Sequence, residues 1–229
     1  MTDFPDKKYN IIYADPPWSF GSKAYQDSGR PFDELENHYN TMSIDEIKKL
    51  DVPSADDCTC FMWTTDAHLK EAIEVMESWG FKYKTIAFIW VKKYEAGSLV
   101  YNFAPYTLKS CEICILGTKG TMGKYKKMNN VKQLVEAVRT KHSKKPDEVR
   151  KRIDMLYGNI PRIELFAREK ADGWDSWGNE IPVETDNIIT DVKIEEQKET
   201  KICELCGVDY TGMTYEQHET RPFHQGRLL

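Results

Sequence analysis

The tetrapeptide Asp15-Pro16-Pro17-Trp18 combines groups that suit chemistry on an amine attached to an aromatic ring. Such an amine is a poor nucleophile because its lone pair is delocalised into the ring. The Asp15 carboxylate and the Pro16 backbone carbonyl can accept its two N–H bonds, which turns the lone pair toward an electrophile. The flat Trp18 side chain offers the ring a stacking surface. The pattern therefore indicates methyl transfer to an amino group on a base. Alternatively, it is a proline-rich turn with a buried tryptophan.

The residues before this motif predict the element that positions it. Residues 9–15 form a short apolar run that ends at Pro16-Pro17, which is typical of a buried strand followed by a turn. In open α/β sheets, ligands bind beyond the carboxyl ends of the strands. We therefore expect Asp15 at the ligand-binding edge of a sheet.

Strand and helix signals alternate along the rest of the chain. We expect further strands at residues 58–63, 85–91, 111–116 and 162–167, and helices at residues 43–50, 66–79 and 146–156. Residues 131–138 are ambiguous, because their apolar spacing suits a helix but the segment is short and rich in valine. The alternation predicts an α/β domain with a mostly parallel sheet.

Composition excludes several classes of protein. The chain has 229 residues, 30% of them charged, and lacks an apolar run long enough for a transmembrane helix. Its first six residues do not resemble a signal peptide. We therefore expect a cytoplasmic protein with no membrane segment. In that compartment the six cysteines are thiols or metal ligands rather than disulfides.

Positive charge is concentrated in one part of an acidic chain. Residues 119–152 hold 12 Lys or Arg against 3 Asp or Glu, whereas the whole chain has a net charge of -5. Such a block is a candidate surface for nucleic-acid phosphates, with Lys119 and Lys124 among the candidate substrate-binding residues. The alternative is a solvated, lysine-rich surface.

The last part of the chain has a different composition. Residues 181–200 are acidic and predict a linker between a domain at residues 1–180 and a small module at residues 201–229. Four residues in the module have the spacing of zinc ligands, namely Cys203, Cys206, His218 and His224. The module resembles a two-Cys, two-His zinc finger, and so short a segment needs a metal to fold. The alternative is an unstructured tail.

Several sequence blocks follow one another between Tyr9 and Glu180. They include Ala14–Trp18, His38–Ser43, Phe61–Thr64, Cys114–Gly120, Ile163–Arg168 and Trp177–Glu180. In this order they resemble the MT-A family, named for the 70-kDa subunit of the mRNA adenosine N6-methyltransferase. The resemblance implies a Rossmann-like methyltransferase fold that uses S-adenosylmethionine (SAM). It also implies a strand at residues 131–138. Because the family has bacterial and phage members, the resemblance implies a bacterial or phage-infected cell as the source.

The resemblance further implies roles for single residues. Asp15, Pro16, Pro17 and Trp18 would hold and stack the target adenine, with Asp15 also near the SAM sulfonium. Contacts to the cofactor are implied for Asp15, Lys145, Phe166, Arg168, Asn179 and Glu180. His38 and Tyr39 match positions that line the site on the substrate side.

Together, these observations predict a SAM-dependent N6-adenine methyltransferase that acts on a flipped-out adenine, with DNA favoured over RNA as substrate. One alternative is an RNA adenosine N6-methyltransferase. Another is a catalytically inactive nucleic-acid-binding subunit. Inactive members of the family have lost the acidic residue of the motif, whereas this chain retains it as Asp15. A third alternative is a small-molecule methyltransferase, but the basic block at residues 119–152 argues against it. A homo-oligomer and a partner subunit both remain open.

Overall fold

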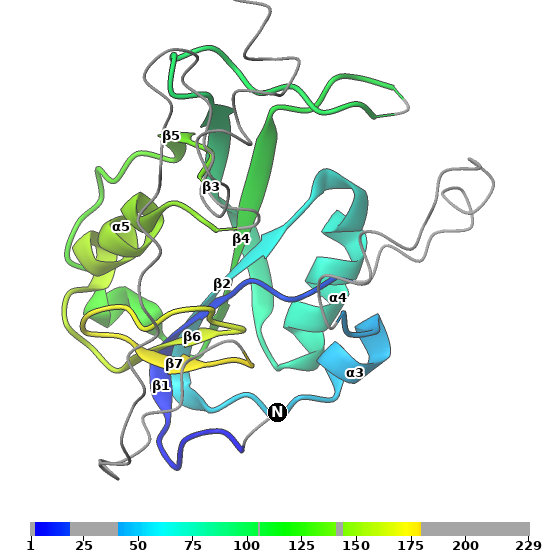
Figure 1. Ribbon diagram of the computed structural model, residues 1–229. Coiled ribbons are helices and arrows are strands. Elements are labelled where there is room, and N and C mark those ends of the chain that lie inside the picture. Colours follow the sequence, from blue (N-terminus) through cyan, green and yellow to red (C-terminus); the bar gives the residue numbers. More distant parts are fainter. Residues whose placement is uncertain (1–2, 19–40, 105, 141–143, 180–229) are drawn as a thin grey trace, which may run out of the picture. The chain divides into compact units, whose positions relative to one another are not determined.

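The computed structural model describes residues 3–18, 41–104, 106–140 and 144–179, and their centre is a seven-stranded sheet (Figure 1). Its strands are β1 (Tyr9–Ala14), β2 (Ser54–Thr64), β3 (Lys82–Lys93), β4 (Cys111–Lys119), β5 (Leu134–Val138), β6 (Arg162–Leu165) and β7 (Asp175–Trp177). Their order across the sheet is β5-β3-β4-β2-β1-β6-β7. The fold is α/β, as predicted.

Six of the seven strands run in the same direction. β1 pairs in parallel with β2 and β6, β3 pairs in parallel with β5, and β6 pairs in parallel with β7. β4 runs antiparallel between β2 and β3. The prediction of a mostly parallel sheet is therefore confirmed, with one reversed strand that the sequence pattern did not indicate.

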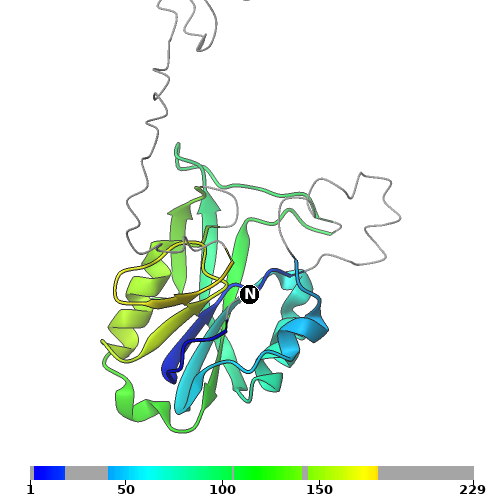
Figure 2. The same ribbon diagram turned by 60° about the horizontal axis from the view of Figure 1, so that its bottom comes forward.

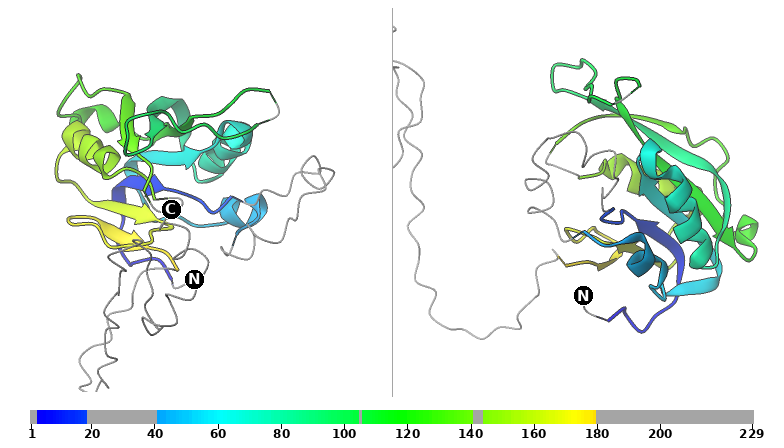
Figure 3. Two further views of the ribbon diagram at one scale, coloured as in Figure 1. Left: turned by 45° about the horizontal axis from the view of Figure 1, so that its top comes forward. Right: turned by 90° about the vertical axis from the view of Figure 1, so that its right-hand side faces the viewer.

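Helices cover both faces of the sheet, as Figures 2 and 3 show. Helices α3 (Ile44–Lys48) and α4 (Leu69–Ser78) pack on one face, and α5 (Asp147–Tyr157) packs on the other. Within β1, Ile12 and Ala14 join the first core, whereas Ile11 and Tyr13 join the second. Successive strand residues point to opposite faces, so a strand covered on both faces is apolar throughout.

Local signals explain where the helices begin and end. The Ser43 hydroxyl accepts the backbone N–H of Glu46, whose carboxylate accepts the Ser43 N–H, so the expected capping box starts α3. Pro146 precedes α5, and Gly158 ends it with a φ of 73°. The helix predicted for residues 66–79 is divided, because Asp66 opens the short 3-10 turn η1 (Asp66–His68) and α4 follows it.

The largest differences from prediction lie in the strands. β2 and β3 extend several residues beyond their apolar runs, because cross-strand pairing continues into polar residues at the sheet margins. Residues 134–138 form a strand, as the resemblance implies and against their helical spacing. β7 was not predicted, since three residues are too few for a periodic pattern.

Some predicted features fall outside the described residues. These are His38, Tyr39, Glu180, the linker at residues 181–200, and the module at residues 201–229 with Cys203, Cys206, His218 and His224. Within the described residues, no cluster of three or more His, Cys, Asp or Glu side chains has the arrangement of a metal site. The helices in that same part of the chain are all too short or too polar to cross a bilayer.

Candidate active site

The topology marks the carboxyl ends of β1 and β6 as the place for a ligand. From β1 the chain continues to β2 on one side, whereas β6, on the other side of β1, leads outward to β7. Ligands in open α/β sheets bind where the strand order reverses in this way. Asp15 follows β1 and Phe166 follows β6 at this point, and the Asp15 N–H donates to the Leu165 carbonyl at 3.4 Å.

The Asp15–Trp18 motif forms a tight turn after β1. The Trp18 N–H donates to the Pro16 carbonyl at 2.9 Å, and the Pro17 carbonyl accepts the Met42 N–H at 3.0 Å. The Pro16 oxygen lies outside helix and strand pairing, as expected, but it accepts a bond within the turn. A carbonyl oxygen has two lone pairs, so one remains for a ligand.

Trp18 is held firmly at this edge. Its side chain is 7% exposed, and its indole N–H donates to the Trp63 carbonyl at 3.2 Å. The His68 ring lies nearly parallel to the indole, with 6.2 Å between centroids and 11° between planes. His68 ends the 3-10 turn η1 and directly precedes α4, and burial lowers the pKa of its imidazole.

A network of charged side chains surrounds the Asp15 carboxylate. Lys145 Nζ lies 2.6 Å from Asp15 Oδ2 and 3.4 Å from Glu112 Oε2. Glu112 also forms an ion pair with Lys92. Lys145 further lies 5.7 Å from the centroid of the Trp63 ring. Two carboxylates and two ammonium groups therefore balance one another beside the motif.

Burial and these partners change the ionisation of the network. Burial raises the pKa of Asp15 above its ordinary value, although the nearby Lys145 ammonium opposes that rise. For Glu112, burial also favours the neutral form, but Lys145 and Lys92 outweigh it and lower its pKa. Burial disfavours charge on Lys145, yet Asp15 and Glu112 outweigh this and raise its pKa. Lys145 thus stays cationic, and Asp15 is the group whose charge is most costly.

The residues after β6 form a second part of the site. Phe166 has a φ of 60°, an uncommon conformation for a residue with a side chain. Gly178 packs so closely on the neighbouring backbone that a Cβ there would lie 2.1 Å from the Ala167 carbonyl oxygen. This contact brings Asn179 alongside the Ala167–Arg168 segment. The Arg168 charge also acts on Asp15, where it lowers the pKa.

The structure thus brings Asp15, Trp18, Lys145, Phe166, Arg168 and Asn179 to one edge of the sheet, but it does not bring Lys119 and Lys124 there. Lys119 pairs with Cys58 in the first half of β2, whereas Asp15 follows Ala14, which pairs with Met62 near the other end of β2. The Lys119 ammonium donates to the Ser54 hydroxyl at 3.2 Å, and Lys124 forms a 2.5 Å ion pair with Asp57. These two lysines therefore lie away from Asp15, and their role in substrate binding stays a prediction.

Sequence reasoning missed three members of this site. Glu112 and Lys92 complete the charge network, and His68 lies beside Trp18. Glu112 had a detectable signal, because it is the one acid within the apolar run of residues 111–116. An acid in a buried strand needs a cation or a function. Lys92 and His68 gave no such signal, since each lies in an ordinary polar stretch.

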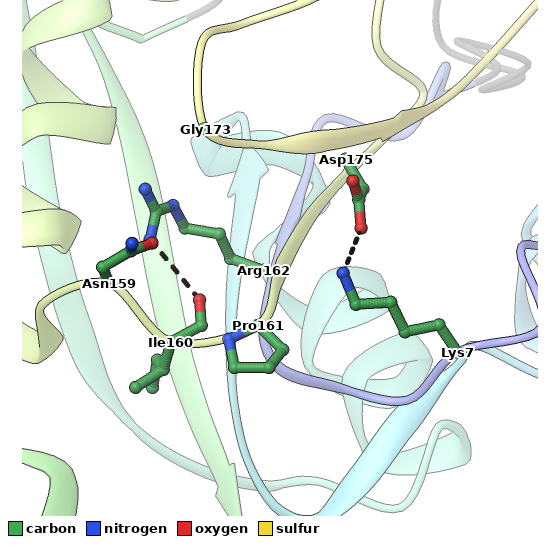
Figure 4. A pocket seen from close by; sticks show the side chains of 7 residues that line it. All are labelled: Lys7, Asn159, Ile160, Pro161, Arg162, Gly173 and Asp175. Carbon is green, nitrogen blue, oxygen red and sulfur yellow. Dashed lines mark hydrogen bonds and ion pairs between the residues drawn. The ribbon is translucent and has the colours of Figure 1, made fainter.

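A pocket of about 260 Å³ lies at the opposite edge of the sheet (Figure 4). Its lining residues are Lys7, Asn159, Ile160, Pro161, Arg162, Gly173 and Asp175. Figure 4 shows Lys7 reaching across it to Asp175, 2.7 Å away. Arg162 donates to the Asn159 side chain at 2.8 Å and lies 3.2 Å from Asp154. The charged residues that line this pocket therefore each have an ion-pair partner, Lys7 and Asp175 with each other and Arg162 with Asp154.

Comparison with known proteins gives similar sequences across the whole site. The profile of the MT-A70 family matches residues 9–180. The type II methyltransferase M.MunI of Mycoplasma sp is 40% identical over 208 residues, which cover 85% of this chain and 87% of that protein. An MT-A70-like N(6)-adenosine-methyltransferase of Arabidopsis thaliana is 29% identical over 178 residues. The human N(6)-adenosine-methyltransferase catalytic subunit METTL3 is 27% identical over 179 residues.

These matches differ in how much of each relative they cover. The plant and human proteins match 76% of this chain, but the chain spans only 24% and 28% of their respective lengths. The Mycoplasma protein is matched over nearly its full length. The family match extends from the start of β1 past the end of β7 and includes every described residue of the candidate site. The chain therefore belongs to the MT-A70 family.

Proposed function

We propose that this protein is a SAM-dependent methyltransferase that methylates N6 of adenine in DNA. The observation that carries the proposal is the Asp15 carboxylate, held by Lys145 at the carboxyl end of β1 beside the free lone pair of the Pro16 oxygen. The relative that matches this chain over most of both lengths is named a type II methyltransferase, which favours DNA as substrate.

The two oxygens at this turn suit the amino group of adenine. The Asp15 carboxylate accepts one N6–H bond and the Pro16 carbonyl accepts the other, which localises the nitrogen lone pair and aims it at the methyl donor. The Trp18 indole, held by the Trp63 carbonyl, supports the base by stacking. The amine is strongly acidic after methyl transfer, so its surplus proton leaves without a strong base.

The residues around Asp15 fit SAM by charge. When bound, SAM supplies a methyl group on a cationic sulfonium, together with a carboxylate and ribose hydroxyls. The buried Asp15 carboxylate favours a cation, and the Lys145 and Arg168 side chains favour an anion. Phe166 and Asn179, placed by the close contact of Gly178 with Ala167, would supply further contacts to SAM, as would Glu180.

RNA is the second candidate substrate, because the plant and human relatives are named N(6)-adenosine-methyltransferases. Those relatives are less similar to this chain, at 29% and 27% identity, than the Mycoplasma protein. Recognition of the 2′-hydroxyl separates the two substrates.

We also propose a structural zinc ion in the module at residues 201–229, held by Cys203, Cys206, His218 and His224. The support is their spacing, which suits tetrahedral coordination by two thiolates and two imidazoles. The metal content of the Cys203→Ser variant tests this proposal. Loss of one zinc per chain is expected, and unchanged stoichiometry would refute the site.

The test of the main proposal is product analysis by mass spectrometry. Purified protein and SAM are incubated separately with double-stranded DNA, single-stranded DNA and RNA, which are then digested to nucleosides. We expect N6-methyldeoxyadenosine from DNA; N6-methyladenosine from RNA alone would keep the chemistry and change the substrate. SAM binding without any product would indicate a missing partner, and absence of SAM binding would favour an inactive subunit.

Substitution of Asp15 tests the assigned residue. The Asp15→Ala variant should keep part of its SAM binding but lose about 10²- to 10³-fold in turnover, the usual loss for a group that stabilises the transition state. Asp51→Ala is a matched control, because Asp51 is an exposed acid away from this edge. Turnover of the Asp15→Ala variant close to that of the wild type would contradict the mechanism.

A further inference from the structure

The segment between β3 and β4 carries an unusual set of exposed aromatic rings. We call residues 94–104 and 106–110 the aromatic arm. In Figures 1 and 2 it projects beyond the ends of these strands. Of nine exposed large hydrophobic side chains in the described residues, five lie in the arm, namely Tyr94, Tyr101, Phe103, Tyr106 and Leu108. Phe103 is 91% exposed and Tyr106 is 98% exposed.

Backbone hydrogen bonds order the arm both near its base and beside Phe103. Asn102 and Lys109 exchange two backbone hydrogen bonds of 2.7 and 2.9 Å, and the Val100 N–H donates to the Lys92 carbonyl at 2.9 Å. Val100 itself is only 1% exposed and anchors the arm to the domain. The aromatic rings are therefore presented to solvent by a paired backbone.

Both ends of the arm join the candidate active site. Lys92, two residues before the arm, and Glu112, two residues after it, form the ion pair that supports Lys145. Lys109 within the arm lies 2.7 Å from Asp66, which is two residues from His68 beside Trp18. The arm therefore emerges from the edge of the sheet at which Asp15 lies.

We infer that the aromatic arm binds nucleic acid by stacking Phe103 and Tyr106 on bases close to the target adenine. This inference rests on the proposed function, because a polymer that delivers an adenine to Asp15 must cross this edge. Exposed aromatic rings are costly in water and mark a partner surface. Every base offers a π-face to such rings. The arm carries one acidic residue, Glu95, and one basic residue, Lys109, so it presents no net negative charge to a polyanion.

The location of the arm beside Asp15 suits the extrusion of an adenine from the duplex. A flipped base leaves its neighbours unstacked, which costs several kcal/mol in a duplex. A ring that stacks on the exposed neighbour replaces part of the lost stacking, as apolar wedges do in other DNA-binding proteins. The arm would thus favour the extruded state of the adenine.

The test is the affinity of the full chain for a labelled single-stranded DNA and for a labelled duplex, measured by fluorescence anisotropy over a series of salt concentrations. The Phe103→Ala/Tyr106→Ala variant should lose about 5- to 150-fold in affinity for each stacked ring removed. Its salt dependence should not change, since stacking releases no counterions. Met155→Ala, which removes a 46% exposed side chain from α5, should bind as the wild type does.

Three further measurements separate the possible outcomes. Phe103→Tyr/Tyr106→Phe should retain affinity, because both rings remain. Unchanged DNA affinity of the double alanine variant overturns the inference. The oligomeric state of both proteins is measured as well: if the wild type is a dimer and this variant is a monomer, the arm joins two copies of the chain and the inference is also overturned. Methyl transfer is assayed separately. If the wild type transfers no methyl group, the proposed function fails. If the double alanine variant still loses DNA affinity in that case, the arm remains a nucleic-acid contact.

Discussion

The Lys145 ammonium lies 2.6 Å from the Asp15 carboxylate, although 130 positions separate the two residues in the chain. Asp15 is placed by β1 and Lys145 by the segment before α5, so the folded sheet is needed to join them. Burial raises the pKa of Asp15, and the Lys145 charge opposes that rise and so favours the ionised carboxylate. The same carboxylate is the proposed acceptor for the substrate amine.

Removal of Lys145 should change the pH dependence of the reaction. The ionised Asp15 is the active form, so the rate falls as the pH drops through the pKa of Asp15. Burial raises this pKa above its ordinary value, and Lys145 offsets part of that rise. In Lys145→Gln the pKa rises further, so the acid limb of kcat/KM against pH moves to higher pH. The neighbouring Lys144→Gln, which removes an ion pair with Glu169, serves as control. Coincident profiles for wild type and Lys145→Gln would exclude this role.

Substitution of Glu112 should have the opposite effect. Its negative charge raises the pKa of Asp15 and also competes for Lys145. In Glu112→Gln both influences disappear, so the acid limb should move to lower pH, while the less constrained Lys145 lowers turnover by about tenfold or more. Glu136→Gln, an exposed acid that pairs with Lys93 on the next strands, is the matched control. A shift to higher pH in Glu112→Gln would show that Glu112 does not act on Asp15 as described.

Gly178 should tolerate no side chain. A Cβ would meet the Ala167 carbonyl oxygen at 2.1 Å, and both partners are backbone, so the segment must move. We expect Gly178→Ala to lose about 1–3 kcal/mol of unfolding free energy, or about 2–12 °C in Tm, together with SAM affinity. Gly123→Ala is the control, because no described atom lies within 4 Å of a Cβ at that position. Calorimetry measures both quantities, and equal stability of the two variants would contradict the close contact.

Lys119 and Lys124 test whether nucleic acid reaches the other edge of the sheet. Each lysine that contacts a phosphate contributes about 0.9 to the slope of log affinity against log salt for duplex DNA. If both bind phosphate, Lys119→Gln/Lys124→Gln reduces this slope by about 2 and leaves the single-turnover rate unchanged. An unchanged slope would show that these lysines do not bind phosphate and make only their contacts with Ser54 and Asp57.

The sequence predicted the parts of the fold and site that depend on local patterns. Apolar runs located most strands, and Asp15–Trp18 located the turn after β1, because alternation and proline act over a few residues. The reversed direction of β4 and the pairing of three-residue β7 depend on contacts between distant segments. No local pattern carries that information.

The site shows the same division. The residue types of Asp15 and Trp18 suggested their chemistry, and the family resemblance supplied Lys145 and Phe166. The ion pair of Glu112 with Lys92, and the parallel rings of His68 and Trp18, arise only when separate segments of the chain come together. Charge density likewise marked residues 119–152 as one block, but the fold sends Lys119 and Lys145 to opposite edges of the sheet.

The pairing of β1 with β6 has a consequence during protein synthesis. Ile12 of β1 lies opposite Ile163 of β6, yet about 150 residues are translated between them, which takes a ribosome roughly 8–30 s. Throughout that interval the backbone N–H and C=O groups along one side of the nascent β1 have no partner and are open to pairing with other chains. A chain that stops before residue 162 would keep this edge permanently, so premature termination should produce a substrate for chaperones and proteases rather than a partly active enzyme.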